Sequence, residues 1–61
     1  MFQVGQQVFS AIHGNGVVTS VFMDEGVFYP IHVKFDSGAS EVYTLDGKMF
    51  ILAEQPDIAP R

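Results

Sequence analysis

Hydrophobic and polar residues alternate along this chain in short runs that are separated by glycine-containing turns. Residues 31–36 read Ile-His-Val-Lys-Phe-Asp, a strict period of two that is typical of a half-buried strand. This strand is expected to direct Ile31, Val33 and Phe35 into the core. Four further strands are expected at residues 7–13, 17–23, 40–44 and 49–53.

The first two predicted strands meet at residues 13–16, which read His-Gly-Asn-Gly. Asn-Gly is typical of a two-residue type I′ turn, because both central positions of that turn need a positive φ. With Asn15 and Gly16 as the loop, Ser10 is expected opposite Val21, and directly opposed residues share a face. This register predicts an inner face made of Val8, Ile12, Val17, Val21 and Met23.

The opposite face of the same hairpin is more apolar than a solvated face should be. Phe9 and Phe22 are predicted to be cross-strand neighbours there. Either the second strand bends strongly and buries both of its faces in a small barrel, or the two rings form an exposed pair that contacts a partner.

The third and fourth predicted strands form a second hairpin with Ser37 and Gly38 as the loop. Lys34 then falls opposite Glu41, and His32 falls opposite Tyr43. The opposite charges of Lys34 and Glu41 favour this register, although such a pair contributes only about 0.2–1 kcal/mol.

Five short strands in one chain predict a small all-β fold, a five-stranded SH3-like barrel of the Tudor or KOW type. Closure of the sheet removes the free edges that a flat sheet would expose. The residues before the first strand are expected to bend at Gly5. The barrel is expected to occupy residues 1–54, and residues 55–61, which contain two prolines, are expected to form a flexible tail.

Composition narrows the functional classes. The formal net charge is −4, which disfavours binding to nucleic acid because such binding depends on Lys and Arg. The chain is 48% hydrophobic over only 61 residues, so part of its apolar surface is expected to remain outside and bind something. The sequence has no cysteine and no apolar run near the roughly 20 residues that span a bilayer, so we expect a cytoplasmic protein that does not enter membranes.

Catalytic and metal-binding chemistry finds no support in the sequence. His13 and His32 lack the further ligands that a metal site needs. The serines lie in no nucleophile motif, and the short glycine turn at residues 14–16 does not match a phosphate-binding loop. We therefore expect no enzyme activity, no cofactor and no metal, and we expect a binding function.

Aromatic side chains are the best candidates for contact with a partner. On a small barrel they lie at the open end or beside a strand edge that can accept a further strand. Phe28 and Tyr29 have an alternative role, which is to plug one end of the barrel. The candidate partner-binding residues are Phe28, Tyr29, Tyr43, Phe9, Phe22 and His32.

Three short segments resemble a known family. Residues 2–8 (Phe-Gln-Val-Gly-Gln-Gln-Val), 13–18 (His-Gly-Asn-Gly-Val-Val) and 33–35 (Val-Lys-Phe) are similar to the SH3-like, Tudor-like module of the CarD family and to the RNA-polymerase-interacting domain of transcription-repair coupling factor. Gln6 departs from the Asp that is usual there, and these 61 residues contain no counterpart of the family's proline-containing strand or of the helical DNA-contacting domain of CarD. The resemblance implies binding to the β subunit of RNA polymerase by strand addition at a barrel edge. Similar openings occur in KOW and Tudor modules and in small phage or mobile-element proteins, so the polymerase is one candidate partner.

The resulting hypothesis is a noncatalytic protein-interaction module that modulates transcription by binding RNA polymerase or another protein. Two alternatives stay open. The barrel could bind single-stranded nucleic acid by stacking bases on exposed aromatic side chains, or it could be a self-associating structural subunit, a homo-oligomer held by its apolar surplus.

Overall fold

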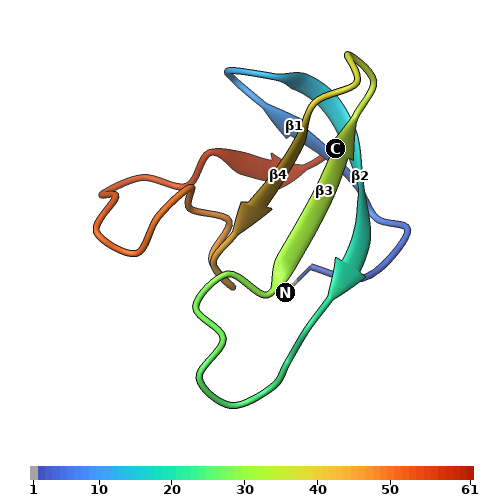
Figure 1. Cartoon of the computed structure of the whole chain (residues 1–61). Coiled ribbons are helices and arrows are strands. Elements are labelled where there is room, and N and C mark those ends of the chain that lie inside the picture. The colour runs from blue at the N-terminus through green and yellow to red at the C-terminus, as the bar shows by residue number, and fades with distance from the viewer. Residues whose placement is uncertain (1) are drawn as a thin grey trace.

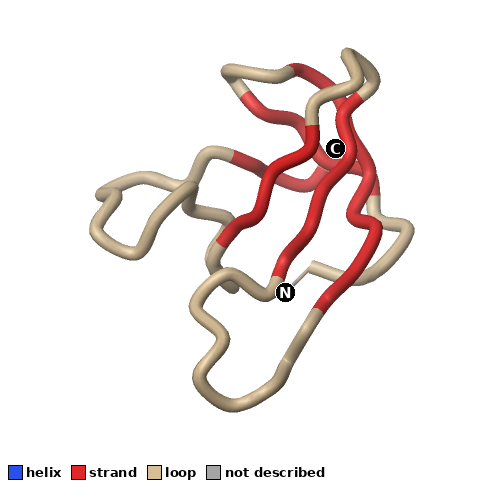
Figure 2. The backbone as a smooth tube through the Cα atoms, in the orientation of Figure 1, coloured by secondary structure: helices blue, strands red, loops and turns tan. Residues whose placement is uncertain are grey.

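The computed structural model describes residues 2–61, and over that range the chain is all-β. One antiparallel sheet of five strands has the order β4-β3-β2-β1-β5 and curls into a half-barrel (Figure 1). This architecture confirms the predicted fold class and is consistent with a small SH3-like barrel. The two longest connections follow β2 and β4 (Figure 2). The strands are β1 (Gln7–Ser10), β2 (Gly14–Val21), β3 (Ile31–Phe35), β4 (Ser40–Tyr43) and β5 (Ile58–Pro60).

The core lies on the concave side of the sheet. Its buried hydrophobic members are Phe2, Val8, Val18, Ile31, Val33, Phe35, Tyr43 and Ile58. The three residues that the period-two pattern directed inward from β3 are all among them, which confirms that prediction. The predicted bend at Gly5 is also present, and this glycine has a positive φ of 88°.

The turn between β1 and β2 differs from the predicted type I′ turn. Ser10 pairs with Gly14, so the loop is residues 11–13, and Asn15 lies within β2. The positive φ falls on Gly14, at 85°, and Asn15 has none. The Oγ atom of Ser10 stabilises the alternative loop because it accepts hydrogen bonds from the N–H groups of Ile12 and His13, both at 3.1 Å.

This register changes the inner face that the hairpin was expected to form. Val8 is buried as predicted, and Val21 packs against the core. Ile12 and Met23 were predicted to face inward, and this was wrong, because their side chains are 65% and 56% exposed. Both lie outside the strands, Ile12 in the loop and Met23 beyond the end of β2.

β2 is long and pairs with β1 on one side and β3 on the other. Gly16 pairs with Phe35, and a methyl group at Gly16 would lie 2.6 Å from Cδ1 of that ring, so only glycine fits beneath it. Val18 follows Gly16 on the inner face and is buried, whereas Val17, predicted to face inward, lies on the opposite face and is half-buried. A β-bulge between Val18 and Ser20 increases the bend of the strand.

The hairpin of β3 and β4 is shifted by one residue from the predicted register. Its loop is residues 36–38, which ends on Gly38 with a φ of 97°. Tyr43 therefore pairs with Ile31 rather than with His32, and Lys34 does not face Glu41, so both expected cross-strand pairs were wrong. Because a shift of one residue exchanges the two faces of a strand, the Tyr43 side chain turns into the core.

The last strand lies later in the chain than predicted. Residues 49–52 form turns and bends, so the strand expected at residues 49–53 was wrong, and β5 lies inside the segment that was expected to be a tail. β5 pairs with β1, and Ile58 is buried in the core. The carbonyl of Gly47 accepts hydrogen bonds from the N–H groups of Asp57 (2.8 Å) and Ile58 (3.2 Å). This turn, rather than a ladder between β4 and β5, bridges the open side of the half-barrel.

No helix long and apolar enough to cross a membrane occurs among residues 2–61.

Candidate functional site

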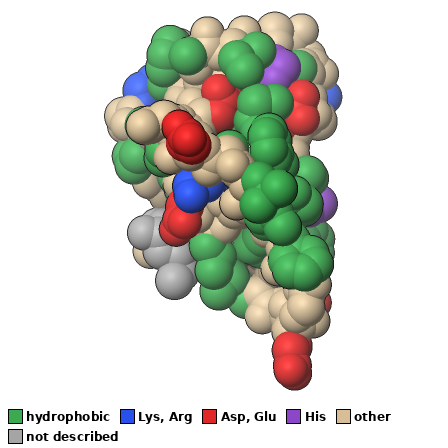
Figure 3. Space-filling view, turned by 90° about the vertical axis from the view of Figure 1, so that its left-hand side faces the viewer, with side chains coloured by type: hydrophobic (Ala, Val, Ile, Leu, Met, Phe, Trp, Pro, Cys, Tyr) green, Lys and Arg blue, Asp and Glu red, His purple; other side chains and the backbone are tan. Residues whose placement is uncertain are grey.

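Large hydrophobic side chains are exposed over much of this small molecule. Figure 3 shows them as a continuous green band on the side from which the segment after β4 projects, with acidic side chains beside the band and at the lower tip of the molecule. Patches of this kind mark interaction surfaces in soluble proteins. Over the whole molecule, the exposed large hydrophobic side chains are those of Val4, Phe9, Ile12, Phe22, Met23, Val27, Phe28, Val42, Leu45, Met49, Phe50, Ile51 and Leu52.

β4 forms one edge of the sheet, and part of its backbone has no neighbouring strand. The N–H of Phe35 donates to the carbonyl of Ala39 at 2.8 Å, so alternate residues of the hairpin from Ala39 onward bond to β3. The residues between them, Ser40 and Val42, direct their N–H and C=O groups away from β3. Over residues 2–61, neither of these N–H groups has a loop or side-chain partner. We call these outward backbone groups of Ser40 and Val42 the β4 edge.

The opposite edge of the sheet, on β5, is blocked. The N–H of Arg61 donates to the carbonyl of Gln7 at 3.0 Å, so the backbone groups of Ile58 and Pro60 point away from β1. The N–H of Ile58 is already bonded to Gly47, and proline has no N–H. β5 therefore offers no free donor along its outer side, and the β4 edge is the one that can accept a further strand.

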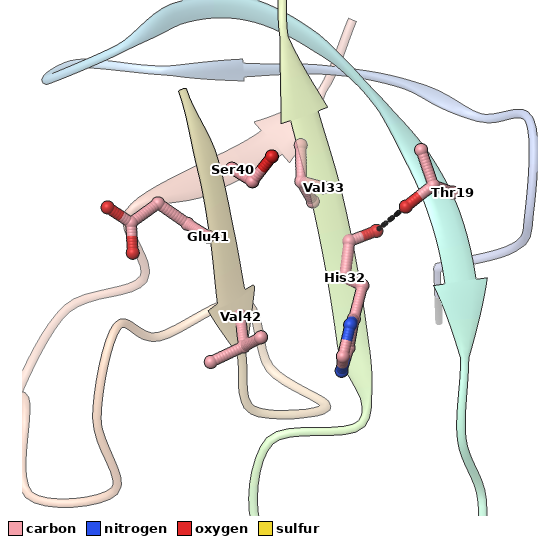
Figure 4. A pocket seen from close by; sticks show the side chains of 6 residues that line it. All are labelled: Thr19, His32, Val33, Ser40, Glu41 and Val42. Atoms are coloured by element: carbon pink, nitrogen blue, oxygen red, sulfur yellow. Dashed lines mark hydrogen bonds between the residues drawn. The ribbon is translucent and has the colours of Figure 1, made fainter. Parts of the chain in front are cut away.

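A shallow pocket of about 310 Å³ adjoins the β4 edge (Figure 4). His32 and Val42 are cross-strand partners, and their side chains extend toward the same end of the sheet in this view. The hydroxyl of Thr19 donates to the carbonyl of His32 at 3.3 Å and holds the bulged part of β2 against β3. The pocket is lined by Thr19, His32, Val33, Ser40, Glu41 and Val42.

An acidic side chain lies on the inner side of the β4 edge. Oε2 of Glu41 is 3.2 Å from Nε2 of His13, and the His13 ring packs on Phe35 with the ring centroids 4.9 Å apart. The Glu41 side chain is partly exposed, so it is accessible to a strand that pairs with β4. A segment that carries Lys or Arg at the matching position would gain a cross-strand charge pair.

One of the candidate residues, Phe28, lines a second depression, which we call the loop cleft, and Tyr29 bonds to another of its lining residues. Phe28 is 66% exposed and lines it, and the hydroxyl of the half-buried Tyr29 accepts a hydrogen bond from the N–H of Ile51 at 3.3 Å. The cleft has a volume of about 330 Å³ and lies between the connection after β2 and the segment after β4. Its lining residues are Val27, Phe28, Pro30, Thr44, Leu45, Asp46, Lys48 and Ile51.

The other exposed candidates lie apart from the cleft and from one another. Phe22 packs edge-on against His32, with the ring centroids 4.8 Å apart, beside the pocket of Figure 4. Phe9 is half-exposed on β1, where its pairing partners are Asn15 and Ala59. Phe9 and Phe22 are therefore not cross-strand neighbours, which corrects the sequence-based expectation.

Tyr43 is a structural residue rather than a surface contact. Its side chain is 0% exposed, and its hydroxyl donates to Oδ2 of Asp57 at 2.8 Å. The same oxygen accepts the hydroxyl of Ser10 at 2.7 Å. Burial, reinforced by the Asp57 carboxylate, raises the pKa of Tyr43 well above its usual range. This cluster ties the end of β1, the end of β4 and the start of β5 together at the open side of the half-barrel.

The sequence did not single out the residues of the β4 edge. Ser40 and Val42 are candidates because of the direction of their backbone groups and not because of their side-chain chemistry. These groups are free because of the strand order, which places β4 at the edge. A backbone site of this kind leaves no residue-type signal in the sequence.

Within residues 2–61, no group of three or more His, Asp or Glu side chains gathers where it could hold a metal ion. Comparison of the chain with models of protein families, with curated proteins and with solved structures gave no match.

Proposed function

We propose that this protein is a noncatalytic protein-interaction module that binds an extended segment of a partner along β4. The observation that carries the proposal is the contrast between the two edges of the sheet. The β4 edge has free outward N–H groups at Ser40 and Val42, whereas β5 has none. Pairing of an added strand with such an edge is an established mode of peptide recognition.

Side chains around the β4 edge would give the pairing specificity. An added strand directs alternate side chains to the two faces of the sheet. On the outer face it meets Val42 and His32, and on the inner face it meets Glu41. This surrounding favours a segment with an apolar residue on one face and a basic residue on the other.

Proline substitution tests this proposal directly. Val42→Pro removes an N–H that β3 does not use, so the sheet is expected to remain folded while strand addition is lost. Val42→Ala is the matched control, because it shortens the side chain and keeps the N–H. Binding lost in Val42→Pro and retained in Val42→Ala, with both variants folded by their amide NMR spectra, supports the proposal. Equal binding by the two folded variants refutes it.

The first partner to test is RNA polymerase. The likeness of residues 2–8 and 13–18 to the polymerase-binding modules described above makes the β subunit a concrete candidate, and modulation of transcription would follow from such binding. Purified polymerase or its isolated β subunit, immobilised and exposed to the two Val42 variants, gives a direct measurement. Absence of binding by the wild-type protein removes the polymerase while leaving the β4 edge to be tested with other partners.

Self-association through the same edge is the second candidate function. Two copies could pair their β4 strands and extend the sheet, since the β4 edge is unpaired in one copy. Sedimentation of the wild-type protein and of the Val42→Pro variant distinguishes self-association from binding to a separate partner. A dimer that Val42→Pro abolishes favours a homo-oligomer, and a monomer at high concentration favours a separate partner.

A further inference from the structure

The run Met-Phe-Ile-Leu at residues 49–52 is an apolar segment that the fold does not bury. The sequence predicted a strand here, yet the run forms exposed turns and bends. Phe50 and Ile51 are 53% and 51% exposed, and Leu52 is 82% exposed. Consecutive exposed apolar residues reduce solubility unless they serve an interface.

Part of this run belongs to the loop cleft. Ile51 lines the cleft opposite Phe28, and the hydrogen bond from its N–H to the Tyr29 hydroxyl links the two walls. The cleft of about 330 Å³ is within the range of sizes that accept a ligand or a few inserted side chains. Ile51 of the apolar run and the exposed Phe28 therefore lie on one surface.

The charges around this surface indicate what can cover it. The segments 22–30 and 44–54 carry one cationic side chain, Lys48, and four carboxylates: Asp24, Glu25, Asp46 and Glu54. An apolar cleft between acidic segments matches a partner that combines apolar side chains with Lys or Arg. An anionic lipid surface would be repelled, and a second copy of the chain would bring acidic segments against acidic segments.

We propose that the loop cleft is a second binding site, which takes a protein segment with apolar anchors flanked by basic residues. Phe28 and Ile51 contact the anchors, and the net negative charge of the two segments that form the cleft, which includes Asp46 in its lining, attracts the basic flanks. The site is separate from the β4 edge and does not depend on strand addition.

Three synthetic peptides of equal length and spacing test the proposal. The first has leucine anchors and lysine flanks, the second has leucine anchors and glutamate flanks, and the third has serine in place of the leucine anchors and keeps the lysine flanks. Each is titrated into the isotope-labelled full chain, and amide shifts are followed by NMR. The leucine–lysine peptide is expected to shift the amide resonances of residues 27–29 and 44–52. Phe28→Ser and Ile51→Ser are expected to weaken its binding by about tenfold or more. Ile12→Ser is the matched control, because Ile12 is 65% exposed in the first hairpin loop and does not line the cleft.

The other arms can overturn the proposal. Equal binding of the leucine–glutamate or serine–lysine peptide contradicts the required combination of charge and apolar anchors. An Ile12→Ser effect as large as that of Ile51→Ser indicates nonspecific adhesion. Amide shifts confined to β4 show that the peptide binds the β4 edge and not the loop cleft. Dimerisation of the protein alone through residues 49–52, or binding to anionic vesicles that the Phe28 and Ile51 variants lose, assigns the cleft to a different occupant and refutes the proposal.

Discussion

Replacement of Tyr43 by Phe removes one hydroxyl from the cluster that holds the open side of the half-barrel together. The Tyr43 ring is fully buried, so Phe can fill the same space without creating a cavity. The lost hydrogen bond, 2.8 Å to Oδ2 of Asp57, has a carboxylate acceptor. Bonds of that type contribute about 1.5–3 kcal/mol. A chain of 61 residues has a free energy of unfolding of only about 3–9 kcal/mol, so a large share of the stability is at stake.

The same substitution changes how stability depends on pH. Burial and the Asp57 carboxylate raise the pKa of Tyr43 above its ordinary value of about 10. Above about pH 10 the unfolded chain releases this proton while the folded chain retains it, so the unfolded state binds fewer protons. The stability of the wild-type protein therefore falls with rising pH in this range, by about 1.4 kcal/mol per pH unit from this group. Tyr43→Phe lacks this loss, and its deficit relative to the wild type is expected to shrink above about pH 10.

Urea denaturation followed by circular dichroism at about pH 7, 9, 10 and 11 measures both effects, since the other titrating groups are common to the two proteins. Tyr29→Phe is the control, because the Tyr29 hydroxyl accepts a single bond of 3.3 Å in an exposed setting. The reasoning is refuted if Tyr43→Phe matches the wild type at neutral pH, or if the difference between them stays constant through the alkaline range.

Three further substitutions test the backbone of the fold by their denaturation midpoints. Gly16→Ala is expected to lose about 1–3 kcal/mol because its methyl group would lie 2.6 Å from the Phe35 ring, and an unchanged midpoint contradicts that close approach. Gly47→Ala is expected to lose about 1–3 kcal/mol, because alanine would have to adopt the positive φ of 86° and its Cβ would lie 3.0 Å from Cγ1 of Ile58. A Gly47→Ala variant as stable as the wild type would show that this turn does not hold β5. Glu41→Pro is expected to lose about 1 kcal/mol or more, since Glu41 bonds to β3, and it should be less stable than the Val42 proline variant. The reverse order of those two variants would mean that the assigned edge faces the wrong way.

The sequence predicts the positions of the strands better than it predicts which strands pair with each other. The alternation in β3 is a local property, so Ile31, Val33 and Phe35 were placed in the core correctly. The last strand was missed because β5 has little strand character of its own. Ile58–Pro60 becomes a strand because it pairs with β1 and because the carbonyl of Gly47 accepts hydrogen bonds from the N–H groups of Asp57 and Ile58. Those contacts join residues far apart in the chain, which no local pattern encodes.

The turns explain why the candidate site was harder to predict than the fold. Asn15-Gly16 and Ser37-Gly38 both match two-residue turns, yet both hairpins form three-residue loops. The glycine of positive φ is Gly14, directly after the first loop, and Gly38, the last residue of the second loop. In the second hairpin the difference is one residue, which exchanges the faces of the strand. Tyr43 then enters the core.

The same shift exchanges the side-chain faces of β4. With the predicted register, Val42 would pair with Val33 and face inward; with the observed one it pairs with His32, and its side chain faces outward. The direction of its N–H is the same in both cases, because Ala39 and Glu41 are the residues that bond to β3 around either loop. The free backbone groups thus follow from the position of β4 at the edge of the sheet, whereas the side chains around them follow from the register of the hairpin, and the Val42→Pro variant tests the free edge.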